Sequence, residues 1–181
     1  ILPHAIDIQS LIFHSPYPMA AEITAISIPQ TIKGAALITG GGQRIGRAIS
    51  LALAGKGYDI ALHYHSSRQD AEMSKKKIES LGRRCQIFPY DLNHDNDLDT
   101  LSTAVFEVFP ECNILINNAS VFEPGRLMEI NNSIFDRHFS INFKSPVFLS
   151  QNFARRCQKG NIINVLDSRV AGNDTEHFKN K

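Results

Sequence analysis

The sequence predicts an α/β domain in which helices cover both faces of a doubly wound parallel sheet. Short apolar runs of strand length alternate with longer segments of helical period along most of the chain. The connections between successive apolar runs are too long for hairpins, so the strands must pair in parallel through right-handed crossovers. A glycine-rich segment at residues 39–46 joins the first apolar run to the first helical segment. A sheet wound in both directions from that point has the strand order 3-2-1-4-5.

The first strand and the first helix carry the clearest pattern. Residues 35–39 form a short apolar run that ends in glycines, as a buried parallel strand does. The helix that follows repeats apolar residues at i, i+3, i+4, i+7 and i+8, a spacing that places them on one inward face. These residues are Ile45, Ala48, Ile49, Ala52 and Leu53. Gly55 and Gly57 then end the helix.

Further strands and helices follow in alternation. The strands are predicted at 59–65, 84–90, 113–117 and 161–166, and the helices at 70–81, 97–109 and 135–158. Pro89 favours an edge position for the third strand, because proline cannot donate to the ladder. Pro146 predicts a kink or a break in the long helical stretch. The residues expected to face inward from the helix at 97–109 are Leu98, Leu101, Val105 and Val108.

Composition and charge exclude several classes of protein. A chain of 181 residues is long enough for one domain with a hydrophobic core. A net charge of +1 gives no reason to expect nucleic acid or a membrane as a partner. No apolar run approaches the roughly 20 residues needed to cross a bilayer. The 3 cysteines are too far apart for a disulfide framework or a zinc site, so we expect no metal, and reduced thiols in a cytoplasmic protein.

Residues 1–33 differ from the rest of the chain and are predicted to be an N-terminal extension. Prolines interrupt short apolar pieces there, and neither a helical nor a strand period persists. Either Met19 is the true initiator and residues 1–18 are translated upstream sequence, or the segment is a short extension that packs on the domain surface. The domain itself is expected at 34–181.

The glycine-rich segment has the composition of the dinucleotide-binding turn of a Rossmann fold. It reads TGGGQRIG from Thr39 to Gly46, after a predicted strand and at the start of an amphipathic helix. A diphosphate needs close backbone approach and free N–H groups at a helix N-terminus, whose dipole favours anions. The candidate cofactor-binding residues here are Gly40, Arg44, Ile45 and Gly46. The alternative is an ordinary tight turn.

The segment after the second predicted strand favours NADPH as the cofactor. An NAD-specific domain usually ends this strand with an acidic residue that binds the adenosine ribose. No carboxylate is present here, while hydroxyl groups and an arginine are available to a 2′-phosphate. The residues concerned are His65, Ser66, Ser67 and Arg68. The alternative is a solvated polar loop.

These motifs together resemble those of the short-chain dehydrogenase/reductase family. The family's TGxxxGxG pattern is matched from Thr39 to Gly46, except that Arg44 replaces the middle glycine. Pteridine reductases and related bacterial dihydropteridine and dihydrofolate reductases carry arginine at this position. The resemblance implies that Arg44 contacts the cofactor diphosphate or the substrate. It also implies that the loop at 65–68, in which Ser67 matches the family's serine, grips the 2′-phosphate.

Two further motifs extend the resemblance along the cofactor site. Asp91 and Leu92 match the pair that contacts the adenine ring in the family. The family's NNAG motif after the fourth strand reads NNAS here, as in pteridine reductases. The residues that this match places beside the cofactor are Asn118, Ala119 and Ser120. Phe122 occupies the position of a phenylalanine that stacks on the pterin ring in pteridine reductases; the alternative is a loop anchor.

The catalytic part of the resemblance depends on two residues. Asn142 matches the asparagine of the family's proton relay. Asp167 stands where most members have serine and pteridine reductases have aspartate, and a carboxyl group can relay a proton to a ring nitrogen when a C=N bond is reduced. The alternative for Asp167 is a helix N-cap or a solvated turn. The substrate-binding residues that the resemblance implies are Arg44, Ser120, Phe122 and Asp167.

The resemblance ends near residue 170 and lacks the family's catalytic Tyr-x-x-x-Lys. The tyrosine is expected near Asn180, and all 4 tyrosines of the chain lie far upstream. We therefore expect a Rossmann fold that is incomplete at its C-terminal side, because of a truncated or frameshifted reading frame. The fifth strand is then an exposed edge, and this chain alone has negligible reductase activity.

Three functions remain open. Arg44, Phe122 and Asp167 favour an NADPH-dependent reductase of pterin-type or dihydrofolate-type small molecules when the protein is full length. The second is a generic reductase of the same family that acts on 3-oxoacyl thioesters, sugars or steroids. The third is a non-catalytic dinucleotide-binding protein. Family members usually form dimers or tetramers, so the resemblance implies a homo-oligomer.

Overall fold

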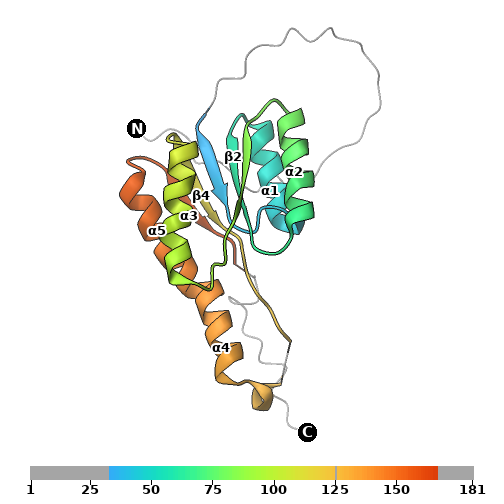
Figure 1. Cartoon of the computed structure of the whole chain (residues 1–181), viewed down its shortest axis with the longest axis vertical. Helices are drawn as coiled ribbons and strands as arrows, with labels where there is room; N and C mark the ends of the chain where they lie inside the picture. The colour runs from blue at the N-terminus through green and yellow to red at the C-terminus, as the bar shows by residue number, and fades with distance from the viewer. Residues whose placement is uncertain (1–32, 125, 167–181) are drawn as a thin grey trace.

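The computed structural model describes residues 33–124 and 126–166, in which strands and helices alternate (Figure 1). The strands are β1 (Ala35–Ile38), β2 (Asp59–Tyr64), β3 (Cys85–Pro89), β4 (Cys112–Asn117) and β5 (Asn161–Asn164). The helices are α1 (Arg44–Gly55), α2 (Arg68–Ser80), α3 (Asp95–Val108), η2 (Leu127–Glu129), α4 (Asn132–Phe139), η3 (Ser140–Lys144) and α5 (Ser145–Arg156). The predicted N-terminal extension lies, up to residue 32, outside the described residues.

The strands form one parallel sheet in the order β3-β2-β1-β4-β5. This confirms the predicted strand order and the doubly wound topology. Pro89 lies at the end of the edge strand β3, opposite Tyr64 of β2, which agrees with the edge position that its missing N–H indicates. Within the described residues β5 forms the other edge. β1 lies between β2 and β4, so the winding of the chain reverses on either side of it.

Each face of the sheet buries its own core. α3 and α5 cover one face, and α1 and α2 cover the other (Figure 1). Alternate residues of a strand point to opposite faces, so Leu37 packs with α3 and α5 while Ile38 packs with α1 and α2. Because both faces are covered, β1 and β2 are buried along their whole length.

α3 buries most of the face predicted for it, namely Leu98, Leu101 and Val105. The prediction is wrong for Val108, which is 42% exposed. α3 ends at Val108, and the next residue, Phe109, turns into the core and is only 1% exposed. The guanidinium of Arg84 lies 4.9 Å from the centroid of the Phe109 ring and covers it. The inward position is therefore taken by the first residue after the helix, which a helical period does not predict.

α1 packs against the sheet through a face that differs from the predicted one. Ile45 is 60% exposed and Ala48 is also exposed, so the prediction is wrong for these residues. The buried face consists of the small residues Gly46, Ser50 and Ala54. The remaining predicted residues, Ile49, Ala52 and Leu53, are half-buried. At Gly46 a side chain has no room, because a Cβ there would lie 2.1 Å from the Gly40 carbonyl oxygen of the glycine-rich turn.

The helical stretch predicted at 135–158 is continuous to Arg156 but contains a π-helical turn just before Pro146, where a kink or a break was predicted. α4 runs into the π-helical turn η3, and α5 begins at Ser145, so Pro146 occupies the first turn of α5. Proline has no N–H to donate to a preceding helical carbonyl group, and the π-helical turn η3 lies directly ahead of it, so the hydrogen-bond pattern of the helix changes at this point. α4 extends away from the sheet, beyond the carboxyl ends of the strands (Figure 1). No helix of the described part of the chain is both long enough and apolar enough to cross a bilayer.

Candidate cofactor-binding site

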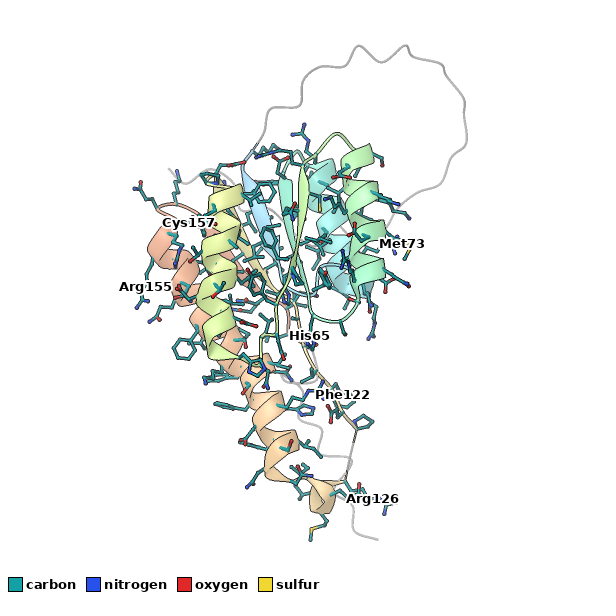
Figure 2. The ribbon with its side chains drawn as sticks, viewed as in Figure 1. His65, Met73, Phe122, Arg126, Arg155 and Cys157 are labelled. Atoms are coloured by element: carbon teal, nitrogen blue, oxygen red, sulfur yellow. The ribbon has the colours of Figure 1, made fainter. Side chains whose placement is uncertain are left out.

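The predicted site residues gather at the carboxyl ends of the strands. β1 leads through the glycine-rich turn into α1, and the neighbouring strands β2 and β4 carry further predicted residues at their ends. His65, which follows β2, and Phe122, in the segment after β4, lie at this same end of the sheet (Figure 2). In an open α/β sheet, ligands bind in the crevice outside the carboxyl ends, at the point where the strand order reverses.

Hydrogen bonds of Asn118 join the segment after β4 to the glycine-rich turn. Its side-chain Nδ2 donates to the carbonyl oxygens of Thr39 and Gly40, at 2.9 and 3.3 Å. In return, the Thr39 hydroxyl oxygen accepts hydrogen bonds from the amides of Asn118 and Ala119, both at 2.9 Å. The structure therefore brings the predicted residues Gly40, Asn118 and Ala119 together. The amide group of Asn118 is used to hold the turn.

Serine hydroxyls hold the next carbonyl groups of the turn. The Ser50 hydroxyl on α1 lies 3.3 Å from the carbonyl oxygen of Gly41 and 2.8 Å from that of Gly46. The Ser74 hydroxyl on α2 donates to the carbonyl oxygen of Gly42 at 2.9 Å. Together with Asn118, these side chains bind the carbonyl oxygens of residues 39–42 on the protein side of the turn.

The amides of the turn fall into two groups. The Gly40 N–H donates to the ring Nδ1 of His63 at 3.1 Å, and the Gly41 N–H donates to the His63 carbonyl oxygen at 2.9 Å. The first hydrogen bond of α1 runs from the Arg47 amide to the Gln43 carbonyl at 3.0 Å. The amides of residues 42–46 lie ahead of that bond and have no backbone acceptor in the described part of the chain. Amides in this position, at the N-terminus of a helix, are suited to bind an anion.

Two residues of the turn have left-handed backbone conformations. Gly40 has a φ of 62°, and a Cβ at this position would lie 3.2 Å from the Ala119 Cα. Arg44 has a φ of 46°, at the position where the family pattern has glycine. A non-glycine residue is strained there by roughly 1–2 kcal/mol. The Arg44 side chain is exposed at the start of α1, as is its neighbour Ile45, so both are open to a ligand.

The loop predicted to bind a 2′-phosphate lies beside the turn, at the start of α2. His65, Ser66 and Arg68 are exposed, and Ser67 is half-buried at the N-cap of α2, where its side chain makes no capping hydrogen bond. Gln43 of the turn donates through Nε2 to Asp70 of α2 at 2.7 Å, which ties the turn to this helix. Hydroxyl, imidazole and guanidinium groups are therefore available next to the anion-binding amides.

A carboxylate from the segment after β3 also lies beside this loop. Asp91 Oδ2 lies 3.7 Å from His65 Nε2 and 3.5 Å from His94 Nε2, so two imidazoles flank its charge. The sequence pattern at the end of β2 did not indicate this acidic neighbour. Leu92 is 5% exposed and packs in the core beneath α3 and α5, so its side chain is not open to an adenine ring.

Asn142, predicted in the proton relay, binds the backbone of the segment after β4. Its Oδ1 accepts from the Val121 amide and its Nδ2 donates to the Val121 carbonyl oxygen, each at 2.8 Å. Asn142 lies within η3, so the π-helical turn places its side chain against this segment. Both polar atoms of the side chain are thus engaged in fixing the loop that carries Phe122.

The same segment is held further along by α4. The Glu123 amide donates to His138 Nε2 at 3.0 Å, and Arg137 Nη1 lies 2.5 Å from Glu123 Oε1. Between these fastened positions, Phe122 is 77% exposed, and Ser120 is also exposed. The loop therefore presents both predicted substrate-binding side chains outward from a fixed backbone.

Asp167, the other predicted catalytic and substrate-binding residue, lies outside the described residues. The functional residues that sequence reasoning missed are those that hold the turn, namely Ser50, His63 and Ser74. All three are polar residues at buried positions, with at most 2% exposure. A polar residue among apolar neighbours in a strand or on the inward face of a helix was the available signal.

The fold and the site define a class of protein. A doubly wound parallel sheet with a glycine-rich turn that leads into a helix at the switch point is the framework of dinucleotide-binding α/β domains. Residues 34–178 match the family described as short chain dehydrogenase. The chain belongs to that family.

Relatives of known sequence and structure agree with this membership. General stress protein 39 of Bacillus subtilis is 33% identical over 143 residues, which cover 77% of this chain and 50% of that protein. A short chain dehydrogenase from Burkholderia cenocepacia, solved in complex with NADP, is 32% identical with a TM-score of 0.72, over 75% of this chain and 56% of that one. A metagenomic short-chain oxidoreductase, also in complex with NADP, is 26% identical with a TM-score of 0.68, over 74% of this chain and 62% of that one. The chain thus spans about half the length of the curated relatives it matches.

Proposed function

We propose that this chain forms the NADP(H)-binding part of a reductase that transfers a hydride to a small-molecule substrate. The observation that carries the proposal is the division of polar backbone groups in the glycine-rich turn. The carbonyl groups of residues 39–42 and the amides of Gly40 and Gly41 are bonded within the protein, whereas the amides of residues 42–46 precede the first hydrogen bond of α1. Such amides at a helix N-terminus suit the diphosphate of a dinucleotide.

Two observations support NADP(H) in preference to NAD(H). No carboxylate belongs to residues 65–68, where Ser67 and Arg68 offer a hydroxyl and a guanidinium to a 2′-phosphate. Asp91, which follows the neighbouring strand β3, is flanked by His65 and His94. The NADP complexes of the Burkholderia and metagenomic relatives point in the same direction.

Titration of the full chain with NADPH and with NADH tests the cofactor proposal. The chain has 0 tryptophans, so the fluorescence of the reduced cofactor itself is the signal. We expect NADPH to bind about tenfold more tightly than NADH, which corresponds to ~1.4 kcal/mol. Arg68→Ala should remove most of this preference by weakening NADPH alone. Arg155→Ala, which changes an exposed arginine on α5 away from the site (Figure 2), is the matched control. A chain that binds neither cofactor would overturn the proposal.

We infer pterin-type or dihydrofolate-type molecules as the substrate class. Support comes from Arg44, whose exposed side chain lies at the start of α1, and from Phe122, whose ring is exposed at the same end of the sheet (Figure 2). A planar heterocycle can stack on such a ring. The roles of Asp167 and of Asn142 in a proton relay remain proposals. The second candidate is a generic reductase of the family, which needs neither Arg44 nor an aromatic ring at 122.

Ligand binding to the NADP⁺-loaded chain separates these substrate classes. Dihydrobiopterin and dihydrofolate should bind, and Phe122→Ala should weaken their binding about tenfold. Phe135→Ala, which removes an exposed ring on α4, should leave it unchanged. Binding of an acetoacetyl thioester in place of the pterin would favour the generic reductase.

The open alternatives beyond the site have separate tests. A Tyr-x-x-x-Lys motif encoded downstream of Lys181 in any frame supports a longer, catalytic protein, and an authentic stop codon there supports the non-catalytic alternative. The homo-oligomeric state and the cytoplasmic location stay predictions; light scattering of the purified protein and microscopy of a tagged protein test them.

A further inference from the structure

His63 is a buried histidine that connects the glycine-rich turn to the end of β3. It lies near the end of β2 and is 2% exposed. Its ring Nδ1 lies 3.1 Å from the Gly40 amide nitrogen, and its ring Nε2 lies 3.0 Å from the Tyr90 carbonyl oxygen. Its own carbonyl oxygen accepts from the Gly41 amide at 2.9 Å. One residue therefore binds two consecutive amides of the turn.

The partners of the ring fix its protonation state. A backbone N–H can only donate, so Nδ1 must accept; a carbonyl can only accept, so Nε2 must carry the proton. The ring is thus a neutral imidazole in one tautomer. Burial lowers the pKa of His63 from 6.5 to about 4, against the opposing effect of the bond to Tyr90. The titratable groups that face it are His65 and Asp91, and the turn at 39–42 has none.

The bond to Nδ1 decides which way the Gly40 peptide faces. Gly40 is held at a φ of 62° with its carbonyl on Asn118 and its amide on His63. Without an acceptor at Nδ1, the half-buried amide of Gly40 is left unpaired, and the peptide gains by turning toward water. That rotation also displaces the next peptides of the turn, from which the anion-binding amides of residues 42–46 follow.

We propose that His63 is a positioning residue of the cofactor site, whose neutral ring holds the glycine-rich turn in the conformation that receives the dinucleotide diphosphate. The proposal depends on the proposed NADP(H)-binding function. The sequence motifs assign no role to His63, whose ring is hydrogen-bonded to two backbone groups. Its effect passes through Gly40 and Gly41.

Two substitutions separate positioning from mere structural support. His63→Leu keeps a side chain of similar bulk and removes the acceptor for the Gly40 amide. His63→Asn keeps an acceptor, because the Asn Oδ1 stands where the imidazole Nδ1 stood, and it loses only the donor to Tyr90. We expect the Kd for NADPH to rise about tenfold in H63L, equivalent to ~1.4 kcal/mol. In H63N we expect it to remain within about threefold of the wild-type value.

The readout is NADPH fluorescence titration on variants shown to be folded by circular dichroism. Wild-type chain that fails to bind NADPH contradicts the proposed function itself. The positioning role is overturned if H63L binds NADPH as tightly as the wild-type chain does. It is also overturned if H63L and H63N lose the same amount of NADPH affinity.

A second measurement covers the case in which H63L does not fold. Protonation turns Nδ1 into a donor, so the NADP⁺ affinity of the wild-type chain should fall more steeply than that of H63N as the pH approaches about 4. Calorimetry with acid-stable NADP⁺ measures this difference, and His65, Asp91 and the 2′-phosphate are present in both experiments. Parallel pH profiles would refute the proposal.

Discussion

Gly46→Ala tests the idea that α1 is packed against the turn too tightly for any side chain. An added Cβ would lie 2.1 Å from the Gly40 carbonyl oxygen and 2.6 Å from Asn118 Nδ2. A carbon and a carbonyl oxygen normally approach no closer than about 3.3 Å, so the backbone must move by roughly 1 Å. Both contacted atoms are hydrogen-bonded to each other and cannot give way independently. We expect the free energy of unfolding to fall by about 2 kcal/mol, within the usual range for overpacking.

Gly55→Ala is the matched control for this change. Gly55 is the last residue of the same helix, and a Cβ there would meet nothing within 4 Å. Alanine is favoured over glycine in a helix by up to about 1 kcal/mol, so this variant should be slightly more stable than the wild-type chain. Both variants replace a glycine of α1 with alanine. They differ in whether the added methyl group has room.

Urea unfolding followed by circular dichroism measures both free energies, and NADPH titration measures the consequence for the site. G46A should unfold at a lower urea concentration and bind NADPH more weakly, because α1 must shift away from the turn. G55A should bind NADPH as the wild-type chain does. If G46A and G55A unfold at the same midpoint with unchanged cofactor affinity, the inferred close packing of α1 and the turn is refuted.

The remaining predictions concern buried or strained charged and ionisable residues. Burial lowers the pKa of His63 from 6.5 in the unfolded chain to about 4 in the folded chain, so the free energy of unfolding should fall by about 3 kcal/mol as the pH falls from 6.5 to 4. Urea unfolding measures this fall, and His63→Asn should lack the part of it that is due to His63. Arg44→Gly should raise the free energy of unfolding by about 1 kcal/mol, because it relieves a φ of 46°, yet weaken NADPH binding; a variant less stable than wild type would contradict this. Asp59 is 1% exposed and accepts from the Arg84 amide at 2.9 Å and from Arg84 Nε at 2.6 Å. Asp59→Asn should therefore lower the melting temperature, with a loss of about 1–2 kcal/mol, and an unchanged melting temperature would contradict it.

The fold followed from the sequence because the signals that determine it are local. Strand-length apolar runs, helical periods and the positions of Pro89 and Pro146 each act within a few residues, and the predicted order of strands is the observed one. The errors occurred where a helix meets something outside its own period. Ile45 is exposed because Gly46 must face the turn, and Val108 is exposed because α3 ends there and Phe109 fills the core.

The site divides in the same way. The glycine-rich turn could be predicted, because a diphosphate makes the same demand of any backbone that surrounds it. The residues that hold the turn could not, because their contacts join positions far apart in the chain. His63 lies 23 residues from Gly40, and Ser74 lies 32 residues from Gly42. No local pattern connects a buried serine on α2 to a carbonyl group at the end of β1.

The glycine-rich turn is held in place by hydrogen bonds within the protein. Its inward polar groups are all bonded before any ligand arrives, so a diphosphate would meet a preorganised surface and little binding energy would be spent on ordering it. In the described part of the chain, the side chains that hold the turn come from α1, β2, α2 and the segment after β4. The proposed substrate side depends instead on the segment that Asn142 and α4 hold. Cofactor affinity should therefore survive changes in α4 that abolish substrate binding, because the two functions rest on separate sets of hydrogen bonds.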